Sequence, residues 1–205
     1  MKKIAVFASG SGSDFQSVID ANEREQFCEI SLLVASKEGI YAIERAKQHG
    51  IDHIVRSKKD FPSSEAMFED IIAELKKRGV DYIVLAGYLS MITPNFVRAF
   101  PDRIINIHPS LIPSFCGKGN YGLNVHRAAL EYGVKISGLT VHFVDEQYDS
   151  GAIILQRAVE VKDDDTPETL QARILEEEHK ALPEAVRLLT TGKLKKEGRK
   201  VTVLA

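Results

Sequence analysis

The chain has 205 residues, of which 27 are Lys or Arg and 29 are Asp or Glu, so its formal net charge is -2. Hydrophobic residues make up 44% of it and charged residues 27%, which is typical of a soluble globular protein and excludes a disordered or fibrous chain. The near-neutral charge argues against a protein that coats nucleic acid or a membrane surface. The only cysteines, Cys28 and Cys116, form neither a disulfide framework nor a metal-ligand pattern, so we expect a cytoplasmic protein without a metal.

The first half of the chain alternates short apolar runs with amphipathic segments. Strands are predicted at residues 4–8, 30–35, 53–55, 82–86 and 103–107. Helices are predicted at residues 14–21, 41–48, 63–76 and 94–99. The apolar run at the N-terminus is too short for a signal peptide or a membrane span. Continuously apolar strands separated by helices favour an α/β fold with a mostly parallel, twisted sheet and helices on both of its faces.

The pattern changes after a helix predicted at residues 123–132. Two long β-rich segments at 135–144 and 152–161 are separated by a polar turn, which predicts an antiparallel addition to the sheet. Thr166 and Pro167 have the chemistry of a helix start. That helix is expected to reach Leu189.

We expect this last helix to bend or restart near Pro183, because proline removes a backbone donor. The basic segment from Lys193 to Val203 predicts a small hairpin that turns at Glu197-Gly198. Since the sequence contains no linker or internal repeat, it predicts one domain over residues 1–189 with a tail over 190–205.

A loop with two glycines, Ser9-Gly10-Ser11-Gly12-Ser13, lies between the first strand and the first helix. Its backbone and the helix N-terminus together suit a phosphate group. A dinucleotide fingerprint is disfavoured, because Phe15 stands where the third glycine belongs and no acidic residue ends the second strand. A tight turn without a ligand remains the alternative.

Asn106 and His108 lie at the carboxyl end of the fifth predicted strand, and alternation places them on the same side of it. An amide donor beside an imidazole can stabilise an oxyanion and move a proton. A lone histidine is more often structural, and we assign structural roles to His142 and His179. His126 is expected at the surface or partly buried.

The turn after residues 138–144 is acidic, since it contains Asp145, Glu146 and Asp149. A solvated turn with a capping aspartate is the plain interpretation. The alternative is that one carboxylate reaches His108, orients the ring and favours its protonated form.

These three pieces, in this order and at these separations, resemble the phosphoribosylglycinamide formyltransferase family of purine biosynthesis. The resemblance extends from Lys3 to about Leu189, and its most specific motifs are Asn106–Pro113 and Gly138–Gly151. It implies a single-domain, Rossmann-like formyltransferase fold. It also implies transfer of the formyl group of 10-formyltetrahydrofolate to the amine of 5'-phosphoribosylglycinamide, which gives formylglycinamide ribonucleotide and tetrahydrofolate.

The resemblance assigns roles to individual residues. It implies the catalytic trio Asn106, His108 and Asp149, and no metal. It places the substrate phosphate at Gly12, Ser13 and Asp14, and the glycinamide substrate at Glu178. The folate-binding residues that it implies are Leu89, Ser90, Met91, Ile92, Asn106, Asp145, Glu146, Gln147, Tyr148 and Asp149.

Three positions depart from the family pattern. Asp14 stands where asparagine is usual, Ser90 where arginine is common, and Ser64 where a basic residue is frequent. A carboxylate beside a phosphate is unfavourable, although backbone N–H groups can still bind the anion. The missing positive charge is expected to come from one of three lysines, Lys58, Lys59 or Lys118.

Other functions stay open at this point. One is another folate-dependent formyl enzyme, such as a formyltetrahydrofolate hydrolase, and another is a non-catalytic module that binds a phosphorylated metabolite. A methionyl-tRNA formyltransferase is disfavoured, because it needs a further basic domain. We expect small-molecule substrates, no nucleic acid or membrane partner, and a monomer or homodimer.

Overall fold

The computed structural model describes residues 1–204 and contains one seven-stranded sheet with the strand order β3-β2-β1-β4-β5-β6-β7. Its first five strands are parallel: β1 (Lys3–Ala8), β2 (Glu29–Ala35), β3 (His53–Val55), β4 (Tyr82–Leu85) and β5 (Ile104–His108). The last two, β6 (Ile136–Phe143) and β7 (Ile153–Glu160), are antiparallel, as the β-rich pattern predicts. The predicted α/β class and its antiparallel addition are confirmed.

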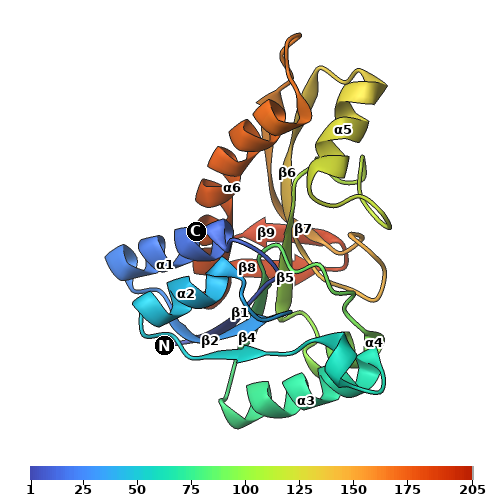
Figure 1. Ribbon diagram of the computed structural model, residues 1–205. Coiled ribbons are helices and arrows are strands. Elements are labelled where there is room, and N and C mark those ends of the chain that lie inside the picture. Colours follow the sequence, from blue (N-terminus) through green and yellow to red (C-terminus); the bar gives the residue numbers. More distant parts are fainter. Residues whose placement is uncertain (205) are drawn as a thin grey trace.

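Helices cover both faces of this sheet (Figure 1). They are α1 (Ser13–Glu25), α2 (Tyr41–Gln48), α3 (Ser64–Lys77), α4 (Pro94–Ala99), α5 (Leu123–Tyr132) and α6 (Pro167–Thr190), with a 3-10 turn η1 (Lys58–Asp60) before α3. One core contains the apolar sides of α1, α2 and α6, and a second core contains those of α3 and α4. Successive residues of β1 contribute to opposite cores, which explains why this strand is apolar throughout.

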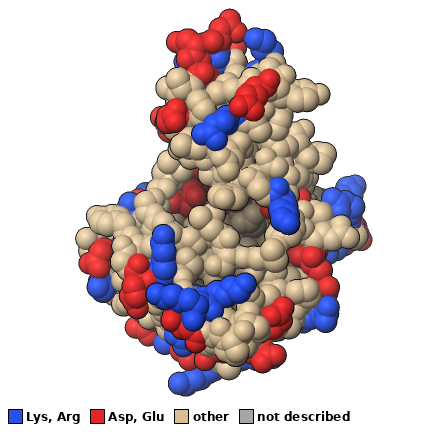
Figure 2. Space-filling view, turned by 45° about the vertical axis from the view of Figure 1, so that its right-hand side comes forward, with Lys and Arg blue, Asp and Glu red and all other residues tan. Residues whose placement is uncertain are grey.

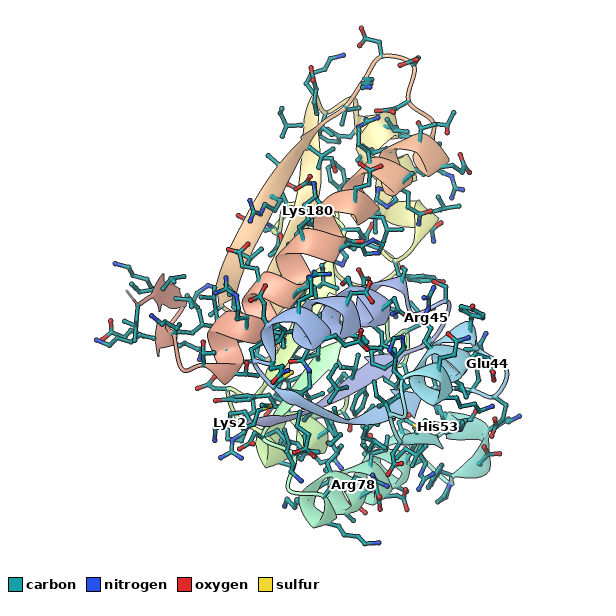
Figure 3. The ribbon with its side chains drawn as sticks, turned by 90° about the vertical axis from the view of Figure 1, so that its left-hand side faces the viewer. Lys2, Glu44, Arg45, His53, Arg78 and Lys180 are labelled. Carbon is teal, nitrogen blue, oxygen red and sulfur yellow. The ribbon has the colours of Figure 1, made fainter. Side chains whose placement is uncertain are left out.

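The upper part of the molecule in Figure 1 consists of the long strands β6 and β7 together with α5 and most of α6. After a quarter turn about the vertical axis, Figure 3 shows α1 between α6, marked by Lys180, and α2, marked by Arg45. The helix α6 begins with a capping box, in which the Thr166 and Thr169 side chains accept hydrogen bonds from each other's backbone N–H groups. Among residues 1–204, no helix has both the length and the apolarity needed to cross a membrane.

Three predicted boundaries differ from those observed. The helix α1 reaches Glu25 instead of residue 21, because it ends only where Gln26 adopts a left-handed backbone with φ of 52°. The strand β5 includes His108, which pairs with Thr140 of β6. The predicted restart at Pro183 is wrong, since α6 is continuous and its apolar side stays buried on either side of that proline.

The C-terminal hairpin is confirmed. It consists of β8 (Leu194–Glu197) and β9 (Lys200–Val203), and the backbone turns at Gly198, whose φ is 60°.

Candidate active site

The strand order places the site at the carboxyl edge of the parallel strands. The chain passes from β3 on one side of β1 to β4 on the other, and such a reversal opens a crevice between the loops that follow the two central strands. The loops after β1 and β4 meet there, because the Ser9 N–H donates to the Gly87 carbonyl (3.1 Å) and the Ser9 hydroxyl accepts from the Leu89 N–H (2.9 Å). Figure 2 shows a hollow in the middle of one face of the molecule, with acidic side chains in its wall.

Asn106 and His108 project from the same side of β5, as the alternation predicts. On β6, Asn106 lies opposite His142 and His108 lies opposite Thr140, so the four side chains share one face of the sheet. The Asn106 amide nitrogen lies 3.2 Å from His142 Nε2. His108 is 5% exposed, and its Nε2 lies 2.9 Å from the Phe115 carbonyl oxygen.

His142, for which a structural role is predicted, belongs to this cluster. Its Nδ1 lies 2.8 Å from its neighbour's carbonyl oxygen, which accepts only from a protonated nitrogen. Burial lowers the pKa of His142, so the ring is neutral and Nε2 is left as an acceptor for the Asn106 amide N–H. His142 therefore orients the amide of Asn106. The sequence signal was a polar residue on the same face as Thr140 in an otherwise apolar strand.

Asp149 comes from the turn after β6 and reaches both histidines. Its Oδ2 lies 3.9 Å from His108 Nδ1, and its Oδ1 lies 3.7 Å from His142 Nε2. Its backbone is left-handed, with φ of 47°, a conformation that Asp and Asn tolerate better than most residues. The Gly117 N–H donates to Asp149 Oδ2 at 2.8 Å. The structure thus brings the predicted trio together.

The glycine loop leads into α1 with Gly12 as the N-cap residue in a left-handed backbone, φ 70°. A Cβ at Gly12 would lie 2.7 Å from the Ala42 Cβ, so only glycine fits between α1 and α2. The guanidinium of Arg45 donates to the Ser11 carbonyl (2.9 Å) and to the Gln16 side chain (3.0 Å). Arg45, which the sequence reasoning missed, is thus a cation bonded to this loop; the expectation for Lys58, Lys59 or Lys118 stays a prediction.

Two carboxyl groups lie beside this loop, that of Glu178 buried and that of Asp14 13% exposed. Asp14 Oδ1 makes no hydrogen bond and lies 3.8 Å from Nε2 of His179, a residue to which we had given only a structural role. Burial raises the pKa of Asp14 to about 6. Burial, together with the nearby Asp14 carboxyl, raises the pKa of Glu178 well above its usual range. The start of α1 therefore has two titratable carboxyl groups beside it, where asparagine at position 14 would leave only that of Glu178.

Apart from Asn106 on β5, the residues expected to bind folate lie in two segments, one after β4 and one after β6. After β4, Leu89 is 63% and Met91 60% exposed. After β6, Asp145 accepts hydrogen bonds from the Gln147 N–H and the Ser150 hydroxyl, and so closes the turn that carries Asp149.

His126, which was expected at the surface or partly buried, is 1% exposed in α5, and burial lowers its pKa to about 4. Within residues 1–204, no three His, Cys, Asp or Glu side chains are grouped so that they could hold a metal ion.

Comparison with known proteins identifies the family. The family model described as "Formyl transferase" matches residues 2–186. The chain belongs to the formyl transferase family. It is 44% identical to the chloroplastic phosphoribosylglycinamide formyltransferase of Arabidopsis thaliana over 95% of this chain. It is 40% identical to the phosphoribosylglycinamide formyltransferase of Bacillus subtilis (strain 168), over 92% of this chain and 95% of that protein.

Among solved structures, glycinamide ribonucleotide transformylase 1 from Symbiobacterium toebii superposes with a TM-score of 0.94 at 41% identity, and the match covers 100% of this chain and 95% of that one. The lengths of the relatives differ. The chain spans 61–67% of the plant formyltransferases that it matches and 14% of the Drosophila trifunctional purine biosynthetic proteins.

Proposed function

We propose that this formyl transferase moves the formyl group of 10-formyltetrahydrofolate to the amine of 5'-phosphoribosylglycinamide, a step of purine biosynthesis that needs no metal. The observation that carries the proposal is the convergence of Asn106, His108 and Asp149 at the carboxyl edge of the sheet, with distances of 3.2–3.9 Å linking them directly or through His142. The names of the relatives support the same reaction.

Asn106 acts on the developing oxyanion. When the substrate amine attacks the formyl carbon, the carbonyl oxygen gains negative charge in a tetrahedral intermediate. His142 accepts one N–H of the Asn106 amide, so the other N–H is free to donate to that oxygen. A donor fixed before the reaction needs no reorganisation in the transition state, and removing such a donor typically costs about 10²–10³ in rate.

His108 supplies a second donor and Asp149 supports it. The Phe115 carbonyl accepts the N–H of His108 Nε2, which leaves Nδ1 as the nitrogen on the side of Asp149. In its protonated form the ring donates from Nδ1 to the oxyanion, and the Asp149 carboxylate lies 3.9 Å from that nitrogen. Asp149 then helps to carry the proton from the attacking amine to the departing folate nitrogen.

The ribonucleotide is assigned to the other end of the crevice. Backbone N–H groups of Gly12, Ser13 and Asp14 bind its phosphate at the start of α1, and Arg45 contributes positive charge to the same loop. Glu178 binds the glycinamide part, and the folate lies against residues 89–92 and 145–149. We place this reaction in the cytoplasm, with both substrates as small molecules and the enzyme as a monomer or homodimer.

Incubation with 10-formyltetrahydrofolate, with and without the ribonucleotide, tests this function. Tetrahydrofolate that forms only when the ribonucleotide is present is the expected result, together with a stoichiometric formylated ribonucleotide. Tetrahydrofolate and formate released at the same rate without the ribonucleotide would indicate a hydrolase instead. No release in either mixture would leave a binding module.

A further inference from the structure

Main-chain groups of residues 115–117 contact two members of the catalytic trio. The Phe115 carbonyl accepts from His108 Nε2 at 2.9 Å, and the Gly117 N–H donates to Asp149 Oδ2 at 2.8 Å. These are the hydrogen bonds that the structure gives to the His108 ring and the Asp149 carboxylate, since the two side chains are 3.9 Å apart. Their relative position is therefore set by the segment between Phe115 and Gly117.

Ser110 anchors the start of this segment. Its side chain is fully buried, and its hydroxyl lies 2.6 Å from the Ser114 carbonyl oxygen and 3.3 Å from that of Phe115. The Ser110 carbonyl in turn accepts from the Thr140 hydroxyl of β6 at 2.7 Å. The Phe115 carbonyl is thus tied through Ser110 to the sheet that carries His108.

The backbone conformation of the segment is costly and needs this support. Phe115 has φ of 50°, which is uncommon for a residue with a side chain and costs about 1–2 kcal/mol. Its ring packs edge-on against Tyr132 of α5, with 5.9 Å between the ring centroids. Gly117 has φ of 85°, and Gly119, two residues further on, has φ of 89°.

We propose that Ser110 and Gly117 are positioning residues for formyl transfer. Gly117 holds the Asp149 carboxylate through its N–H. The Ser110 hydroxyl donates mainly to the Ser114 carbonyl, with the Phe115 carbonyl 3.3 Å away, and so holds the turn whose Phe115 carbonyl accepts from Nε2 of His108. Neither residue touches the substrate in this account. The inference rests on the proposed function, because it assigns a task to His108 and Asp149 within that reaction.

The expected effect is large because catalysis depends on distances of this order. A displacement of about 1 Å in a catalytic group can cost about 10² in rate. Loss of the Gly117 hydrogen bond frees Asp149 to rotate away from His108, and loss of the Ser110 hydroxyl frees the Phe115 carbonyl. Both changes act on the chemical step and leave the loops after β1 and β4 untouched, so kcat falls while KM for either substrate stays nearly constant.

The matched pair Gly117→Ala and Gly119→Ala provides the test. Alanine keeps the backbone N–H, so Gly117→Ala acts by straining the left-handed backbone at φ of 85° and thereby displacing the N–H that donates to Asp149. A Cβ at either position meets nothing within 4 Å, and the two φ values are nearly the same, so the added strain is similar. Gly119 makes no hydrogen bond to a catalytic side chain. We expect Gly117→Ala to lower kcat by about tenfold or more with KM within about twofold, and Gly119→Ala to change kcat by less than about twofold.

A second pair keeps the proposal testable if Gly117→Ala does not fold. Ser110→Ala removes the buried hydroxyl, whereas Ser114→Ala removes an exposed hydroxyl in the same turn. We expect a lower kcat only for Ser110→Ala, with both variants folded by circular dichroism. Equal kcat values within both pairs, or losses confined to KM, would overturn the proposal. Formyl transfer by the wild-type enzyme, measured in the same assay, shows separately whether the proposed function holds.

Discussion

His108 Nδ1 lies 3.9 Å from Asp149 Oδ2, a distance that permits an ion pair but is too long for a hydrogen bond. The ring nitrogen that faces Asp149 therefore makes no direct hydrogen bond to that carboxylate. The two residues come from the end of β5 and from the turn after β6, so the antiparallel pairing of these strands brings them together.

The first prediction concerns the charge of Asp149. Asp149→Asn keeps the shape, an acceptor for the Gly117 N–H and a residue type that tolerates the left-handed backbone. It removes only the negative charge beside His108, so we expect kcat to fall by about 10² or more with little change in the melting temperature. Steady-state kinetics and thermal unfolding measure both. A variant with at least half the wild-type kcat would show that the charge is not required.

The second prediction concerns His142 as the acceptor for Asn106. His142→Phe fills similar space but leaves the Asn106 amide without its partner, so the amide can turn away from the oxyanion. We expect kcat to fall by about tenfold. His142→Gln retains a carbonyl acceptor and should recover part of that loss. If the phenylalanine and glutamine variants have the same kcat, His142 contributes only packing.

The third prediction concerns the partly buried Asp14. Its folded-state pKa of about 6 lies above the usual value of about 3.9 for an aspartate, so the folded protein binds this proton more tightly than the unfolded chain does. The stability that this proton contributes is fully present below about pH 4 and is lost as the pH rises through about 6. The free energy of unfolding above that range is therefore lower by about 3 kcal/mol than below it.

Asp14→Asn should therefore raise the free energy of unfolding at pH 7 by about 1–3 kcal/mol. The free energy of unfolding of this variant should also change less between pH 4 and 6 than that of the wild type. The change that remains comes from Glu178, whose pKa is raised as well. Urea unfolding at several pH values measures this. Curves for wild type and Asp14→Asn that run parallel from pH 4 to 7 would contradict the assignment.

The fourth prediction compares two glycines of one loop. Gly12→Ala forces a Cβ to within 2.7 Å of the Ala42 Cβ and strains a left-handed backbone, so we expect a loss of about 2–4 kcal/mol of stability. Gly10→Ala meets nothing within 4 Å and should change stability by less than about 0.5 kcal/mol. Chemical denaturation of both variants is the measurement. Equal losses would show that contact with α2 does not restrict position 12.

Most of the fold could be predicted from local patterns in the sequence. The apolar strands and helix starts place the parallel sheet, and alternation alone places Asn106 and His108 on one side of β5. The roles of His142 and Arg45 depend on contacts with distant segments, across the β5–β6 pairing and between α2 and the glycine loop. The contacts of Phe115 and Gly117 arise from main-chain groups, which carry no sequence signature. The restart expected near Pro183 does not occur, because the long buried face of α6 outweighs the loss of one backbone donor.

The most direct test of the account is the single-turnover rate of formyl transfer by His108→Ala, measured with saturating 10-formyltetrahydrofolate and 5'-phosphoribosylglycinamide. A single turnover isolates the chemical step from product release. The account predicts a rate at least about a hundredfold below that of the wild type, because one of the two oxyanion donors is gone. A rate within a few fold of the wild type would contradict it.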